Sequence, residues 1–98
     1  MVPLRVPSDI SSSDLQNFFI SMVSIFGLDG TESTLKQYPG CVHWHLNKPG
    51  EKGTLEATWW PKKRKFWLAV HENRRADWQE QVMDHILLMW HTTHEGPQ

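Results

Sequence analysis

The stretch LEATWWPKKRKFWLAV, residues 55–70, places apolar side chains at every second position on both sides of a short basic loop. A period of two is typical of a strand with one buried face. A loop of four residues, 61–64, aligns the two apolar sets and sets Trp59 opposite Phe66, and that length is common in hairpins. A five-residue loop would instead oppose Trp59 to Trp67 and turn one apolar set outward. The first register buries more apolar surface, so it is the one we expect.

A third strand precedes this hairpin, because residues 41–46 continue the period of two. The step Pro49-Gly50 between the strands suits the central positions of a type II turn. Three short strands with short connections indicate an antiparallel meander. Matching the apolar faces predicts these cross-strand pairs: His43 with Thr58, His45 with Glu56, and Leu46 with Leu55.

Residues 11–26 have the periodicity of an amphipathic helix, with one apolar stripe from Leu15 to Phe26. Ser11 as N-cap places Asp14 at the third helical position, which is the spacing of a capping box. Gly27 stands where the left-handed residue of a C-terminal cap belongs. The sequence therefore predicts where this helix begins and ends.

A second helix is predicted from residue 77 to about residue 91, where Trp78, Val82, Ile86 and Trp90 recur every four residues. Asp77 and Glu80 have N-cap and N3 spacing, so we expect Asp77 to cap this helix.

The resulting order is αβββα within a single domain, residues 1–98. We expect the α+β class, as a two-layer sandwich in which both helices cover one face of a three-stranded antiparallel meander. The folded core would span 10–91. Prolines make residues 1–9 an extended arm, and the polar, turn-rich stretch 29–40 is predicted as a loop. Residues 92–98 are expected to form a frayed tail.

Composition excludes several classes of protein. The 98 residues contain one cysteine, which cannot support an intramolecular disulfide framework. The longest apolar run has five residues, against about 20 for a membrane span, so we expect no membrane contact and a cytoplasmic location. The net charge of −1 conceals a basic middle, since residues 36–75 carry nine basic and three acidic side chains.

The sheet face away from the helices is the candidate interaction face. Two tryptophans directed outward suggest a binding surface, because exposed apolar groups rimmed by polar ones mark interaction sites. We therefore expect a small non-enzymatic interaction module that binds a protein partner or forms a homodimer. The interaction face would comprise His43, His45, Glu56, Thr58, Trp60, Trp67 and His71.

Nucleic-acid binding is the alternative function. Basic side chains at a hairpin tip can neutralise phosphates, and arginines near a helix start can hold an anion. The candidates are Lys62, Lys63, Arg64, Lys65, Arg74 and Arg75. The same lysines can also serve solubility by guarding the hairpin against edge pairing.

The sequence does not favour two further chemistries, metal binding and catalysis by a cysteine–histidine dyad. His43 and His45 share a strand face and could converge on one metal with Glu56, but no second His or Cys cluster completes the set. Solvated histidines are the commoner outcome, so we expect neither metal nor cofactor. Cys41 with His43 would need an orienting group and an oxyanion hole to act as a catalytic dyad, and no motif supplies them.

Overall fold

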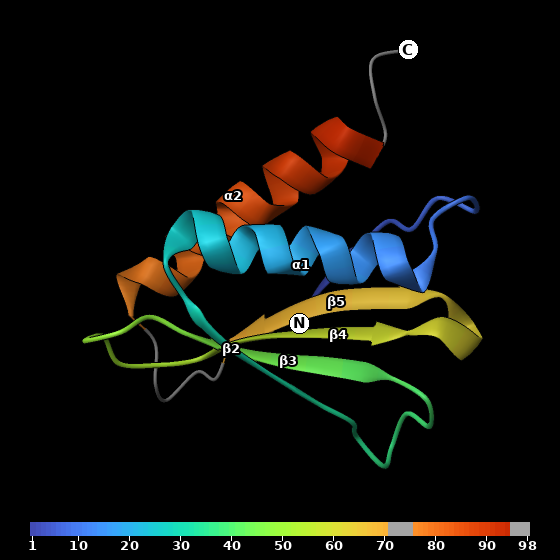
Figure 1. Cartoon of the computed structure of the whole chain (residues 1–98), viewed down its shortest axis with the longest axis horizontal. Coiled ribbons are helices and arrows are strands. Elements are labelled where there is room, and N and C mark those ends of the chain that lie inside the picture. Colours follow the sequence, from blue (N-terminus) through green and yellow to red (C-terminus); the bar gives the residue numbers. More distant parts are fainter. Residues whose placement is uncertain (71–75, 95–98) are drawn as a thin grey trace.

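The computed structural model describes residues 1–70 and 76–94 and has two helices over a five-stranded antiparallel sheet (Figure 1). The strand order is β1-β5-β4-β3-β2. The elements are β1 Val2–Leu4, α1 Ser12–Phe26, β2 Asp29–Ser33, β3 Val42–Asn47, β4 Leu55–Trp60, the 3-10 turn η1 Pro61–Lys63, β5 Lys65–Val70 and α2 Asp77–His94.

The predicted α+β class is confirmed, but the three-stranded meander is wrong because two edge strands were missed. One of them, β2, lies in the stretch predicted as a loop. Its sequence DGTES is exposed at all five positions, so it has no apolar alternation to reveal it. It is held by antiparallel pairing with β3, and Gly30 lets α1 pass close, since a Cβ there would lie 3.2 Å from the Val23 side chain.

The other missed strand, β1, lies in the predicted N-terminal arm and pairs with the outer edge of β5. Leu4 lies opposite Phe66 and is buried in the core. Pro3 is tolerated because an edge strand leaves one row of backbone groups unpaired. The Arg64 guanidinium reaches across to donate hydrogen bonds to the carbonyl oxygens of Pro7, at 2.7 Å, and Ile10, at 2.9 Å.

The predicted register of the three central strands is confirmed. Trp59 pairs with Phe66 across the β4–β5 hairpin, and His45 pairs with Glu56 between β3 and β4. The hairpin loop is the turn η1, followed by Arg64 in the left-handed conformation, with φ 50°. The turn at residues 48–51 is also as predicted: Gly50 has φ 79° and the ends are joined by a 2.9 Å backbone hydrogen bond.

The predicted caps of α1 are both present. Ser11 and Asp14 form a reciprocal capping box, and Gly27, with φ 62°, ends the helix. The predicted cap of α2 is wrong, because Asp77 lies inside the first turn rather than before it. Gln79 takes the reciprocal role, accepting the Ala76 N–H at 2.7 Å. α2 also continues beyond the predicted end, to His94.

Among the described residues, no helix is long and apolar enough to cross a bilayer.

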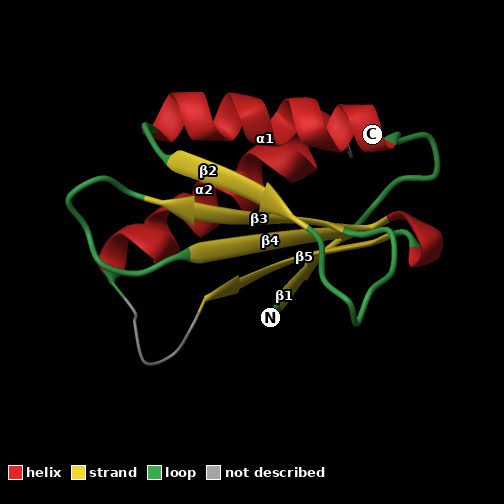
Figure 2. Cartoon of the chain, turned by 60° about the horizontal axis from the view of Figure 1, so that its bottom comes forward, coloured by secondary structure: helices red, strands yellow, loops and turns green. Residues whose placement is uncertain are grey.

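Both helices pack on the same side of the sheet and share one core with it (Figure 2). Phe19 of α1 stacks on Trp44 of β3, with ring centroids 4.6 Å apart. Trp90 of α2 meets Phe66 of β5 edge-to-face at 5.1 Å, and Phe19 meets the same ring at 5.4 Å. The alternate side chains of these strands are thereby directed away from the helices.

Replacing Phe19 with alanine should lower the free energy of unfolding by roughly 3–5 kcal/mol, because its ring is 1% exposed and packs on Trp44 and Phe66. The neighbouring Ile20 is 67% exposed, so Ile20→Ala should cost less than about 0.5 kcal/mol. Denaturant titration measures both values. A loss below about 1 kcal/mol for Phe19→Ala would show that the helix stripe is misplaced.

Candidate functional site

The outer face of the sheet, opposite the helices, brings most of the predicted interaction residues together. Register places His43, Thr58 and Trp67 in one row across β3, β4 and β5. His45, Glu56 and Ala69 form the adjacent row. His71 belongs to the same prediction but lies outside the described residues.

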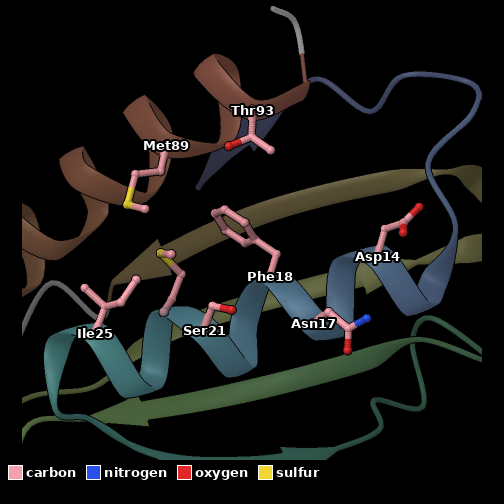
Figure 3. A pocket seen from close by; sticks show the side chains of 8 residues that line it. Asp14, Asn17, Phe18, Ser21, Ile25, Met89 and Thr93 are labelled. Carbon is pink, nitrogen blue, oxygen red and sulfur yellow. The ribbon is translucent and has the colours of Figure 1, made fainter.

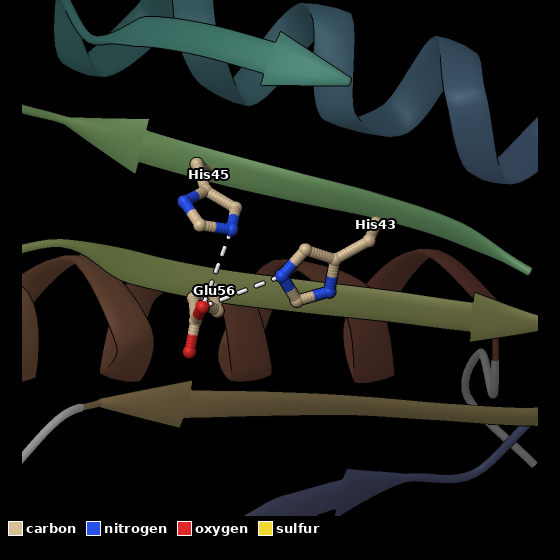
Figure 4. Close-up of side chains that lie close together, drawn as sticks. All are labelled: His43, His45 and Glu56. Carbon is tan, nitrogen blue, oxygen red and sulfur yellow. Dashed lines mark hydrogen bonds and ion pairs between the residues drawn. The ribbon is translucent and has the colours of Figure 1, made fainter. Parts of the chain in front are cut away.

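Two imidazoles meet one carboxylate at the centre of this face (Figure 4). The Nε2 atoms of His43 and His45 each lie 3.3 Å from the same oxygen, Oε1 of Glu56. The imidazole rings have centroids 4.7 Å apart and are inclined at 73°. The three side chains can therefore share protons, or offer three donor atoms to one cation.

Burial distinguishes the two histidines. The side chain of His43 is 7% exposed and that of His45 is 46% exposed, although they are two residues apart on the same face. Thr58 is also buried, and its hydroxyl oxygen lies 2.7 Å from His43 Nδ1. Both ring nitrogens of His43 thus have a partner, Thr58 for Nδ1 and Glu56 for Nε2. Within this cluster, the partner of the His45 ring nitrogen is Glu56.

Desolvation lowers the pKa of His43 below its ordinary value of 6.5, because burial disfavours the imidazolium. The Glu56 carboxylate opposes this effect through its hydrogen bond and its charge, while a charged His45 adds to it. The net direction is downward, so the surroundings of His43 favour its neutral form.

The two outer tryptophans are half-buried rather than exposed, because the 34–41 loop folds over them. The Tyr38 ring lies 5.0 Å from the ring of Trp60 and 5.0 Å from that of Trp67. Trp60 also donates its indole N–H to the carbonyl of Pro39 at 3.0 Å. Tyr38 is therefore part of the outer face that sequence reasoning missed, since a single tyrosine in a polar loop has no periodic pattern.

Cys41 anchors this loop. Its side chain is 1% exposed, and its sulfur accepts the backbone N–H of Leu35 at 3.3 Å. The thiol is thus committed to packing and loop closure.

The basic hairpin is divided by the structure. Lys62, Lys63 and Lys65 are exposed. Arg64 is also exposed, but its guanidinium donates hydrogen bonds to two carbonyls of the N-terminal segment, and its guanidinium carbon lies 5.6 Å from the Trp59 ring centroid. Arg74 and Arg75, the other predicted anion ligands, lie outside the described residues.

The helix layer contains a groove of about 350 Å³ between α1 and α2 (Figure 3). Its lining is mainly apolar and includes Phe18, Met22, Ile25 and Met89. Ligand sites usually add a few convergent polar groups to such a lining. Four polar residues, Asp14, Asn17, Ser21 and Thr93, also line this groove, and Asp14 is bonded to Ser11 in the capping box of α1. The outer sheet face is the better candidate because its polar groups converge.

Comparison with protein-family models, with curated proteins and with solved structures finds no match to this chain. The functional argument therefore depends on the side chains described above.

Acid should destabilise the fold through His43. Its pKa is lower in the folded protein, so the unfolded chain binds more protons once the pH falls to about 6.5. The contribution of His43 is present above that pH and is lost as the pH falls further. Urea unfolding at pH 7.5 and 5.5 should show a larger acid-induced loss for the wild type than for His43→Gln.

The exposed His85 supplies the control for this measurement. His85→Gln, measured at the same two pH values, shows the effect of replacing a histidine outside the cluster. An identical acid-induced loss in His43→Gln and the wild type would remove His43 as the source.

Proposed function

We propose that this protein is a non-enzymatic binding module whose outer sheet face recognises a protein partner, most simply a second copy of the chain. The observation that carries the proposal is the grouping on this face of His45 and Glu56 with the half-buried Trp60 and Trp67. Aromatic rings beside polar groups are the chemistry of interface anchors, and tryptophan is enriched among residues that dominate binding energy.

The charges on this face favour a second copy as the occupant. Lys65 lies at one corner, opposite Trp60 in β4, and Asp29 lies at the diagonal corner, opposite Asn47 in β3. Both side chains are exposed. In a symmetric dimer the same patch faces itself. A two-fold axis that lies between the two faces, perpendicular to the line joining these corners, brings Lys65 of one copy toward Asp29 of the other. A net charge of −1 also does little to keep two copies apart.

A charge swap tests this arrangement. Sedimentation at micromolar concentration should show a dimer that is weakened roughly 10-fold by Asp29→Lys or by Lys65→Asp, because two symmetry-related pairs change from attraction to repulsion. The double variant, with both charges exchanged, should recover the wild-type affinity.

Lys52→Asp is the matched control, because Lys52 is exposed on the 48–54 turn and the substitution changes the net charge by the same amount as Lys65→Asp. It should leave the dimer unchanged. A wild type that stays monomeric, or a double variant that shows no recovery, would contradict the proposal.

Nucleic-acid binding remains the second candidate, on the observation that Lys62, Lys63 and Lys65 are exposed together at one end of the sheet. It ranks second because Arg64, the cation best suited to phosphate, is already bound to backbone carbonyls. The dimer proposal expects no retention of DNA or RNA at ~50 mM salt. Retention that disappears when the three lysines become alanine, with Arg64 kept, would favour the second candidate instead.

A further inference from the structure

We propose that His43, His45 and Glu56 form a zinc-binding site on the outer sheet face. Each offers one donor atom, and the three donor atoms lie within 4.8 Å of one another. Figure 4 shows the two imidazoles extending from β3 toward the carboxylate on β4. The site lies within one chain, so it does not depend on the dimer proposed above.

Two of the three separations between donor atoms suit a tetrahedral ion. Zinc bonds of about 2.0–2.1 Å at tetrahedral angles separate neighbouring donor atoms by about 3.3–3.4 Å. Both Nε2 atoms already lie 3.3 Å from Glu56 Oε1. A zinc ion would replace the protons that the imidazoles otherwise share with this oxygen, and the exposed His45 ring is free of core packing that would oppose a small rotation.

The surroundings of His43 resemble the outer shell of a metal site. A ligating histidine commonly donates its second N–H to an oxygen, which fixes the ring orientation and the tautomer. The Thr58 hydroxyl lies 2.7 Å from His43 Nδ1, so the Nδ1–H can donate to it and leave Nε2 for the metal. Thr58 is 2% exposed, which holds its hydroxyl in place.

Two nitrogen donors and one carboxylate oxygen select zinc over magnesium or calcium, which prefer oxygen ligands. Three protein ligands leave a fourth position on the ion. Water can occupy this position, since the His45 side chain is 46% exposed.

Titration of the full chain with Zn²⁺ by calorimetry tests the site. We expect one ion per chain, and a tetrahedral absorption spectrum when Co²⁺ replaces zinc. His45→Gln and Glu56→Gln should each lower the affinity by more than about 100-fold, because each removes a ligand and losses of 10- to 100-fold already follow changes outside the ligand set. His45 is exposed, so its replacement should leave the fold intact.

Thr58 tests the positioning of His43 separately. Thr58→Val should weaken zinc binding about 10- to 100-fold, and Thr58→Ser, which restores the hydroxyl, should recover it. His85→Gln and His91→Gln, on α2, are the controls for binding by other histidines and should bind zinc as the wild type does.

The proposal is overturned if His45→Gln and Glu56→Gln bind zinc normally. It is also overturned if the controls lose the ion, or if half an ion per chain bridges two copies. A monomer that binds one zinc would support this site while contradicting the dimer, so the two proposals fail separately.

Discussion

The pairing of Trp59 with Phe66 across the β4–β5 hairpin is the constraint on which the rest of the structure depends. Side chains alternate between the faces of a strand, so this pair fixes the direction of every residue in β4 and β5. β3 and β1 take their registers from these two strands. A slip of one residue in β5 would direct Trp67 into the core and expose Phe66, which is 1% exposed in this register.

The same register joins the core to the outer face. Phe66 meets Phe19 and Trp90 on the helix side, which holds the sheet against both helices. One residue along the strand, Trp67 meets Tyr38 on the opposite side. The polar cluster at Glu56 thus sits on a sheet whose reverse side is a packed aromatic layer, and such backing limits the movement of the strands that carry it.

The sequence predicted the parts of the fold that follow from periodicity and caps, and missed those that depend on backbone pairing. The Ser11 cap was predicted from local spacing, and it is present. The cross-strand pair of His45 with Glu56 was predicted from apolar alternation, and it is also present. Gly30 and Pro3 lie in the missed strands, β2 and β1. These strands have polar or proline-containing sequences and are formed by pairing with a neighbouring strand. Tyr38 reaches the outer face through a loop, so no spacing rule could have placed it there.

The sequence predicted which residues lie on the outer face, but not how deeply they are buried. Alternation identified His43 as an outer residue, but not that it would be 5% exposed and in contact with Thr58 and Glu56. Nuclear magnetic resonance tests the central claim most directly, through cross-strand nuclear Overhauser effects. The account predicts contacts of Trp59 with Phe66 and of His45 with Glu56. Contacts of Trp59 with Trp67, in the register of a five-residue loop, would contradict it.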